Sequence, residues 1–281
     1  MTFERALNYG KELLREAKVP DYELDAWYLM EYTCKMSKSE YYLYGPEEME
    51  NEQFQEYELL LKKRGERVPL QYITGKQEFM GLDFKVNSHV LIPRQDTETL
   101  VEEAIKVLEP GMEILDLCTG SGCIIISLLK YAKPKVLGTA SDISKQALLI
   151  AKENAKINQV ELNLIRSDLF QNIIGTFDLI ISNPPYIPTN MIQTLMPEVR
   201  NFEPLEALDG KEDGLSFYRE IAQKSKEFLK AKGYLYFEIG HDQGEQVAFL
   251  MENQGFQNVK IIQDLAGKDR VVCGSLPEEI E

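Results

Sequence analysis

The first third of the chain carries apolar residues at the spacing of a single helix face. In residues 3–17 they recur at i, i+3 and i+4, which predicts an amphipathic helix. Pro20 stops this helix, and Asp21 is a suitable N-cap for the next one. A second apolar face begins at Leu24, and a third helix is predicted around residues 54–64. We therefore expect a small all-helical N-terminal domain over residues 1–70, marginally stable by itself.

From about residue 70 the pattern changes from helical to extended. The stretch LQYITGKQEFMGLDFKVNSHVLIP is rich in β-branched and aromatic residues, and Gly75 and Gly81 interrupt it. This composition predicts a β-hairpin linker over residues 71–92.

After Pro93 short apolar runs alternate with segments of helical period. The runs predict strands at 112–118, 135–142, 162–168, 177–183, 233–240, 258–264 and 270–274. Helices are predicted at 123–133, 144–158, 215–230 and 243–255. Such alternation indicates an α/β domain over residues 93–281, with a mostly parallel seven-stranded sheet covered by helices on both faces. Ligands of such sheets bind at the carboxyl ends of the strands.

Composition narrows the class of protein. Of the 281 residues 44% are hydrophobic and 27% charged, as in ordinary globular proteins. No apolar run reaches the roughly 18 residues of a membrane span, and the N-terminus is charged from Glu4, unlike a signal peptide. We therefore expect a cytoplasmic protein without a membrane partner. The net charge of −15 disfavours, without excluding, a protein that grips nucleic acid through its phosphates.

Cysteine and histidine are too sparse to suggest a metal centre. The four cysteines, at 34, 118, 123 and 273, form no C-x-x-C pair, and the only histidines are His89 and His241. We expect no metal site and four reduced thiols in packing positions. The same scarcity argues against a Cys–His or Ser–His nucleophile.

The stretch ILDLCTGSGC reads as a strand, a glycine turn and a helix start. Gly120 and Gly122 would let the backbone approach a ligand closely. A dinucleotide fingerprint needs a third glycine where Ile125 stands, so this turn is a poor pyrophosphate site. Asp116 ends the strand before the turn, where its carboxylate would repel a phosphate but help to hold a cationic ligand.

Acidic residues also end the next two predicted strands. Asp142 comes about twenty residues after the turn, where a carboxylate can accept both ribose hydroxyls. Asp168 is placed to meet an adenine amino group, and Leu169 to pack on the purine face. An adenosine with a cationic, phosphate-free tail fits this set, and S-adenosylmethionine is such a molecule. For any one residue a turn glycine or helix cap is a competing explanation; the set in this order favours the cofactor.

The NPPY sequence at 183–186 ends the fourth predicted strand. Pro184 and Pro185 fix two consecutive φ angles and offer carbonyls without N–H groups. The Asn183 side-chain oxygen and the Pro184 carbonyl can both accept hydrogen bonds from one NH₂ group. Tyr186 supplies a flat face for a planar group. The substrate predicted here is a planar amide or the exocyclic amine of a base, although Asn-Pro is also common turn chemistry.

Together these motifs resemble class I (Rossmann-like) S-adenosylmethionine-dependent N-methyltransferases. NPPY occurs both in enzymes that methylate base amines of DNA and RNA and in glutamine methyltransferases, so it does not choose between them. The segments 69–103, 201–221, 236–244 and 264–272 closely resemble the bacterial family that methylates a glutamine side-chain amide in peptide chain release factors. This likeness runs over essentially the whole chain, whereas the sister family acting on a ribosomal protein differs more in its N-terminal region and linker.

The resemblance implies a role for each motif. Cys118, Thr119, Gly120, Ser121 and Gly122 would line the methionine and ribose of S-adenosylmethionine, which leaves as S-adenosylhomocysteine. Asp142 would hold the ribose, and Asp168 with Leu169 the adenine. Asn183, Pro184, Pro185 and Tyr186 would hold the substrate glutamine, which lies in a Gly-Gly-Gln loop of the release factor, and Asn183 would also contact the cofactor. The helical domain would help to recognise that partner, and a monomer is expected.

Two residues depart from the family pattern. Cys118 stands where a glycine is usual, so its side chain must point away from the ligand or narrow the pocket. Gln95 replaces a usual proline and loosens that turn. The neighbouring Arg94 is open to three interpretations: a brace for the active-site loop, a partner of the donor carboxylate, or a plain salt bridge.

Three other functions were weighed against this one. A nucleic-acid amine methyltransferase is disfavoured by the charge and by the lack of a basic stripe with interleaved aromatic residues. A non-enzymatic S-adenosylmethionine-binding protein would not need an intact NPPY. A dinucleotide oxidoreductase is disfavoured by Ile125.

Overall fold

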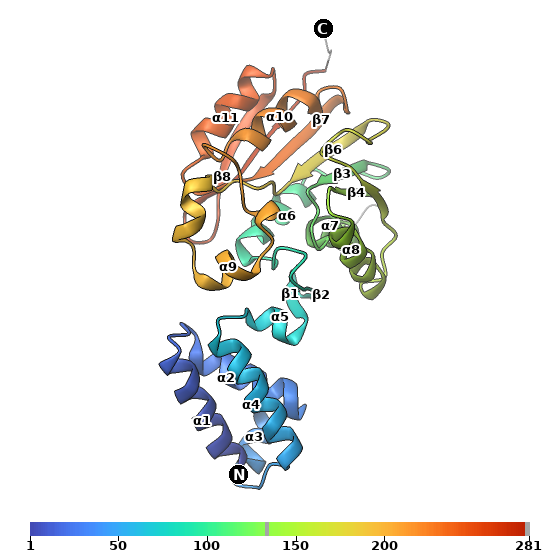
Figure 1. The fold of residues 1–281 in the computed structure, drawn as a ribbon. Coiled ribbons are helices and arrows are strands. Elements are labelled where there is room, and N and C mark those ends of the chain that lie inside the picture. The colour runs from blue at the N-terminus through green and yellow to red at the C-terminus, as the bar shows by residue number, and fades with distance from the viewer. Residues whose placement is uncertain (133–134, 279–281) are drawn as a thin grey trace. The chain divides into compact units, whose positions relative to one another are not determined.

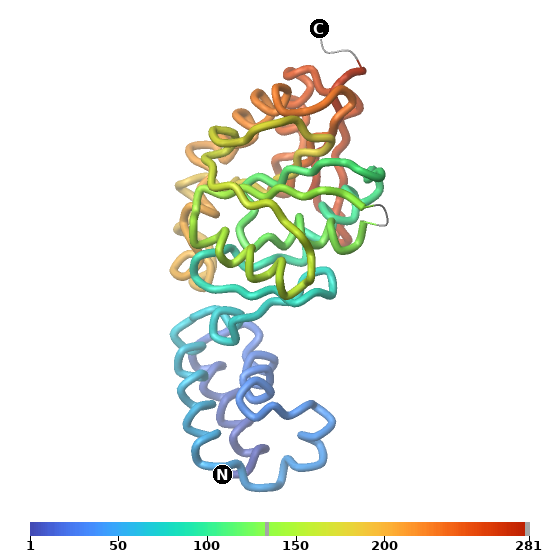
Figure 2. Tube along the Cα trace, turned by 90° about the vertical axis from the view of Figure 1, so that its right-hand side faces the viewer, coloured from blue at the N-terminus to red at the C-terminus, as the bar shows by residue number. Residues whose placement is uncertain are grey.

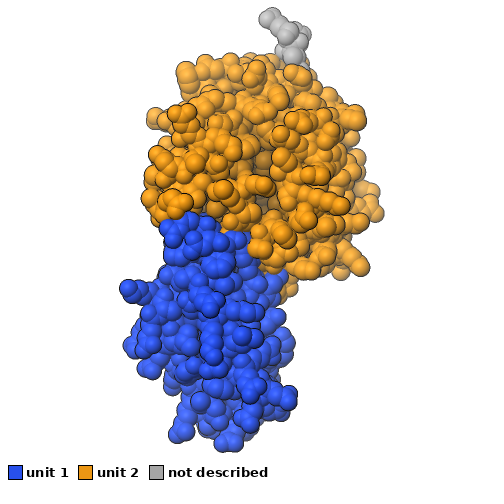
Figure 3. Space-filling view, in the orientation of Figure 1, with its two compact units in different colours: residues 1–75, 196–202 blue, residues 76–195, 203–281 orange. Residues whose placement is uncertain are grey.

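The computed structural model describes residues 1–132 and 135–278. The ends of the predicted helix 123–133 and of the predicted domain 93–281 therefore lie outside the described residues. The chain forms two compact units, Met1–Gly75 with Met196–Phe202, and Lys76–Leu195 with Glu203–Glu281 (Figure 3). It thus passes between the units after Gly75, after Leu195 and after Phe202. The boundary predicted from the sequence lies after residue 70.

The first unit is helical (Figures 1 and 2). It contains α1 (Phe3–Glu16), α2 (Tyr22–Cys34), α3 (Lys38–Tyr44), α4 (Asn51–Gly65), α5 (Leu70–Thr74) and, from much later in the chain, α9 (Pro197–Phe202). The three helices predicted from periodicity are confirmed as α1, α2 and α4, which pack around fully buried Leu14, Met30 and Tyr57. The short helices α3 and α5 were missed, because seven and five residues are too few to show a period.

The second unit begins with the predicted hairpin, formed by β1 (Lys76–Phe79) and antiparallel β2 (Leu82–Lys85). Its main sheet contains β3 (Glu113–Leu117), β4 (Leu137–Asp142), β5 (Asn163–Arg166), β6 (Phe177–Ser182), β7 (Leu229–Glu238), β8 (Gln257–Gln263) and β9 (Asp269–Ser275). The strand order is β5-β4-β3-β6-β7-β9-β8, and β9 runs in the direction opposite to the other six strands of this sheet. The predicted mostly parallel seven-stranded sheet is confirmed.

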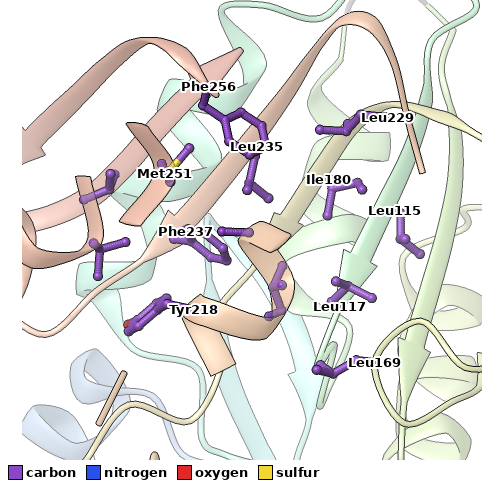
Figure 4. Close-up of a cluster of buried hydrophobic side chains, with 14 of the residues drawn as sticks. Leu115, Leu117, Leu169, Ile180, Tyr218, Leu229, Leu235, Phe237, Met251 and Phe256 are labelled. Carbon is purple, nitrogen blue, oxygen red and sulfur yellow. The ribbon is translucent and has the colours of Figure 1, made fainter. Parts of the chain in front are cut away.

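Helices cover both faces of this sheet, because successive strand residues point to opposite sides. Ile114 of β3 packs with α6 (Glu98–Ile105), α7 (Cys123–Tyr131) and α8 (Lys145–Ile157). Leu115 and Leu117 point the other way, into a cluster with α10 (Ser216–Ser225) and α11 (Gly244–Asn253). Figure 4 shows this second cluster, in which Tyr218 and Phe237 pack against one another.

The strand order positions the functional site. The chain builds β3, β4 and β5 outward in one direction and then returns to place β6 on the other side of β3. The carboxyl ends of β3 and β6 therefore lie side by side at a topological switch point, where open α/β sheets bind their ligands. Short 3₁₀ segments η1 (Gln95–Thr97), η2 (Thr189–Thr194) and η3 (Leu205–Ala207) belong to the connections. Among the described residues no helix is long and apolar enough to cross a membrane.

Candidate active site

A cavity of about 350 Å³ lies in the second unit, at the carboxyl ends of β3 to β6. The residues predicted for the cofactor and substrate that line it are Cys118, Thr119, Gly120, Ser121, Asp142, Asp168, Leu169, Asn183 and Pro185. Four further predicted residues, Asp116, Gly122, Pro184 and Tyr186, are not among the described residues of its wall. The structure thus gathers motifs that are far apart in the sequence around a single cavity.

The glycine turn between β3 and α7 is shaped by left-handed backbone. Gly120 has φ +55°, and a Cβ there would meet no protein atom within 4 Å, so its surroundings are open. Gly122 has φ +80°, and a Cβ there would lie 2.9 Å from Ile126 Cδ1 and 3.2 Å from Ala151 Cβ. Gly120 thus keeps a side chain out of the open space beside the turn, whereas Gly122 permits close packing of α7 on α8.

Asp142 ties this turn to the end of β4. Its Oδ2 accepts the N–H of Gly120 at 2.9 Å, and its Oδ1 accepts the N–H of Ser144 at 2.8 Å. Each carboxylate oxygen has a further lone pair, and the residue lines the cavity, so it can still accept a hydroxyl from a ligand. Burial raises the pKa of Asp142, against the lowering effect of these two backbone hydrogen bonds.

Asp116 lies behind the turn. It is fully buried, and the Thr119 hydroxyl donates to its Oδ2 at 2.6 Å. Its Oδ1 has no hydrogen-bond partner among the described residues, and burial raises the pKa of this carboxyl to about 7. Asp116 therefore supports Thr119 in the cavity wall and places a carboxylate close behind it.

Cys118, at the start of this turn, takes a backbone conformation that is unusual for a residue with a side chain. Its φ is +59°, in the left-handed region that favours glycine. The residue lines the cavity, and its side chain packs against the core cluster on the α10 face. Burial raises the pKa of its thiol, which is consistent with a packing role.

The wall predicted from the sequence to meet adenine follows β5. Leu169 is 6% exposed and lines the cavity with a φ of +44°, another left-handed residue. Asp168 beside it is exposed and accepts a hydrogen bond from Gln171 Nε2 at 3.4 Å. An apolar side chain and an exposed carboxylate thus stand together on this wall, the combination that we expected for adenine.

NPPY follows directly on β6, and its first two residues offer unused acceptors. The Asn183 side chain and the Pro184 carbonyl take part in no hydrogen bond with any residue that the structure describes. Asn183 and Pro185 line the cavity, so NPPY borders the space expected for the cofactor. The strand itself is held by Ser182 Oγ, which donates to the Leu117 carbonyl of β3 at 2.8 Å.

Two walls of the cavity were missed from the sequence. One comes from the segment before α6, with Ser88, His89, Val90, Leu91, Pro93 and Thr97. The other comes from the segment that leads into α10, with Pro204, Glu206, Ala207 and Lys211, and is completed by Phe217 within α10. These loop residues follow no periodic pattern. Arg94 also lines the cavity and forms an ion pair with Glu203.

Family models match both parts of the chain. Residues 5–75 match the PrmC N-terminal domain, and residues 95–197 match the Methyltransferase small domain. A solved methyltransferase from Pyrococcus furiosus is similar in fold, with a TM-score of 0.54 and 19% identity, over 72% of this chain and 91% of that one.

Curated relatives are similar over almost the full length. The chain is 41% identical to the release factor glutamine methyltransferase of Fusobacterium nucleatum, over 94% of this chain and 76% of that protein. It is 39% identical to the protein of the same name from Clostridium acetobutylicum, over 97% of this chain and 98% of that protein. On this likeness, the chain belongs to the release factor glutamine methyltransferase family.

Proposed function

We propose that this chain transfers a methyl group from S-adenosylmethionine to the side-chain amide nitrogen of the glutamine in the Gly-Gly-Gln loop of release factors, in the cytoplasm. The observation that carries the proposal is the pair of unused acceptors, Asn183 and the Pro184 carbonyl, beside a cavity suited to the donor. The names of the relatives, found over nearly the whole chain, select glutamine among planar NH₂ groups.

The cavity has the chemistry that S-adenosylmethionine requires. Asp142 keeps free lone pairs for the ribose hydroxyls, and Leu169 offers an apolar surface to the purine. Gly120 leaves open space beside the turn, and the buried Asp116 carboxyl lies behind it. When bound, the donor supplies an electrophilic methyl group on a sulfonium ion, whose positive charge these carboxyl groups favour.

The substrate side works by orientation. An amide nitrogen is a weak nucleophile, because its lone pair is delocalised into the carbonyl. Asn183 and the Pro184 carbonyl would accept its two N–H groups, which directs the nitrogen and raises its electron density. Tyr186 provides a face against which the planar amide can lie. Holding the nitrogen in one orientation lowers the barrier by proximity, so these residues can act without a strong base.

The alternative substrate is an exocyclic amine of a DNA or RNA base, which NPPY could hold in the same way. The net charge of −15 disfavours it, because the phosphates of a nucleic acid and the protein as a whole carry charge of the same sign.

Labelled S-adenosylmethionine tests the proposal against this alternative. The protein is incubated in parallel with release factor, with release factor whose loop glutamine is replaced by alanine, with DNA and with RNA. We expect label only in the unaltered release factor, on the loop glutamine. Label in nucleic acid with none in release factor would overturn the proposal. Equal labelling of the unaltered release factor and of the one that lacks the loop glutamine would also overturn it.

A further inference from the structure

The backbone and side chain of Tyr186 are held from the end of β7. The pairing of Ser182 with Phe237 brings NPPY beside the segment that follows β7. The Tyr186 hydroxyl donates to Glu238 Oε1 at 3.4 Å, and the Tyr186 carbonyl accepts from Gln243 Nε2 at 3.1 Å. Two contacts on opposite ends of the residue thus define where its ring lies.

A close backbone contact adds to this hold. Gly214 has φ +75°, and a Cβ there would lie 2.4 Å from the Tyr186 carbonyl oxygen and 2.8 Å from Gln243 Nε2. No side chain fits between these groups, so the position requires glycine. The Tyr186 main chain is therefore fixed by packing. Its side chain packs against the core cluster on the α10 face, and the acceptor at its hydroxyl adds a directional contact that sets the ring.

Glu238 is an expensive residue to keep for packing alone. It is 2% exposed, and its Oε2 has no hydrogen-bond partner among the described residues. The nearby Arg270 makes its ion pairs with Asp96 and Asp264, at 3.0 and 3.2 Å. Burial raises the pKa of the Glu238 carboxyl to about 7, against the lowering effects of the Thr97 hydroxyl and of Arg270. A buried carboxyl without a direct ion pair costs free energy, which an apolar side chain would avoid. The hydrogen bond that Glu238 Oε1 accepts from the Tyr186 hydroxyl is a reason to keep a carboxyl here.

We propose that Glu238 is a positioning residue for the methyl transfer: it accepts the Tyr186 hydroxyl and so presets the ring face that receives the substrate amide. Since the inference depends on that role of Tyr186, it rests on the proposed function. Glu238 touches neither substrate nor donor in this account. Its loss should therefore reduce turnover while the affinity for S-adenosylmethionine is retained.

A double-mutant cycle separates positioning from general stability. Glu238→Leu, which keeps the site buried and removes the acceptor, should lower kcat about tenfold, as the loss of one hydrogen bond can. Glu238→Gln retains an acceptor oxygen and should restore most of this loss. In a Tyr186→Phe background Glu238→Leu should cost nothing more. An equal loss in both backgrounds, or no loss in the wild type, would overturn the proposal.

Tyr236→Phe is the matched control for the loss of a buried polar group on β7. Tyr236 stands two residues before Glu238, is 5% exposed and packs on the α6 face. This variant should change the Tm without lowering kcat. A tenfold fall in its kcat would show that any polar loss on β7 has the same effect and would overturn the positioning role.

A readout without release factor keeps the inference distinct from the proposed function. With ¹³C-labelled tyrosine, the Tyr186 ring signal is assigned as the one that Tyr186→Phe removes. Glu238→Leu should shift or broaden this signal and leave that of Tyr236 in place, whereas Glu238→Gln should preserve both. An unchanged Tyr186 signal in Glu238→Leu would refute the positioning role, whether or not release factor is methylated.

Discussion

At the scale of single residues, the site combines acceptors that lack partners with backbone that most residues avoid. The Asn183 side chain and the Pro184 carbonyl make no hydrogen bonds with the described residues. By contrast, the side chains of Ser182 and Tyr186 on either side of them are hydrogen-bonded. Cys118 and Leu169 take positive φ angles in the cavity wall. Such strain persists only where the surrounding structure enforces it, and here it lies at the proposed donor site.

Replacing Asn183 should separate chemistry from donor binding. Asn183→Ala removes one of two acceptors for the amide, so we expect kcat to fall at least about a hundredfold, by analogy with the loss of one oriented hydrogen-bonding group. The affinity for S-adenosylmethionine, measured by calorimetry, should change little. Asn163→Ala, on the exposed edge strand β5, is the control and should retain full turnover. Near wild-type turnover in Asn183→Ala would contradict the two-acceptor account.

Asp116 should make the stability of the protein depend on pH. Burial raises the pKa of its carboxyl to about 7 from its ordinary value of 3.8, so between these values the folded state binds more protons than the unfolded state. Its contribution to stability is therefore full below pH 4 and is lost as the pH rises to 7, with a slope of at most about 1.4 kcal/mol per pH unit.

This dependence is measured by urea unfolding between pH 5 and 8. In Asp116→Asn the free energy of unfolding should depend less steeply on pH than in the wild type. Part of the dependence should remain, because burial also raises the pKa of Glu238 to about 7. Identical slopes in the two proteins would mean that the pKa of Asp116 is not raised on folding.

At the scale of elements, the connection of β3 to α7 depends on how closely α7 packs on α8. Gly122→Ala adds a left-handed strain of about 1–2 kcal/mol and also brings its Cβ to 3.2 Å from Ala151 Cβ. Gly111→Ala is the matched control, since its φ is +83° and its Cβ would meet nothing within 4 Å. We expect urea unfolding to show a larger loss in Gly122→Ala, and calorimetry to show weaker binding of S-adenosylmethionine only in that variant. Equal losses in the two variants would contradict the packing role.

The strands and their carboxyl ends could be predicted from the sequence, whereas some contacts between elements could not. The seven strands were predictable because β-branched runs such as FDLIIS are bounded by turns and followed by helices of clear period. The ends of β3, β4, β5 and β6 could be predicted as a site because parallel strands bring their carboxyl ends together. Glu238 and Gln243 could not be recognised as neighbours of Tyr186, because that contact comes from strand register and a glycine-lined turn rather than from local pattern.

At the scale of the whole molecule, residues 196–202 belong with the N-terminal helices. Glu198 of α9 accepts hydrogen bonds from Arg64 at 2.9 Å and from Arg67 at 2.6 Å, and Arg64 also pairs with Asp25 at 2.7 Å. Arg64 and Glu198 are both buried, so this cluster is a buried ion network that includes a distant segment of the chain. No periodicity in the sequence predicts such a contact.

Removing Glu198 should release this segment from the first unit. Glu198→Ala leaves the buried Arg64 with Asp25 as its remaining ionic partner, and the free energy of unfolding should fall by on the order of 3 kcal/mol. We expect a lower Tm, together with faster amide hydrogen exchange across 196–202. Glu12→Ala disrupts the exposed pair with Arg15 and should have little effect on either measurement. Unchanged exchange in α9 after Glu198→Ala would show that the ion network does not anchor it.

The same network has a consequence for protein synthesis. Glu198 follows Arg64 by 134 residues, a distance that a ribosome covers in roughly 7–27 s at the usual rate of elongation. Throughout that interval the helices already synthesised contain Arg64 and its partner Asp25 but lack Glu198, the second carboxylate that pairs with Arg64. The unit that leaves the ribosome first is therefore completed only when a segment from within the second unit has been made, so chaperones have time to meet it in an unfinished state.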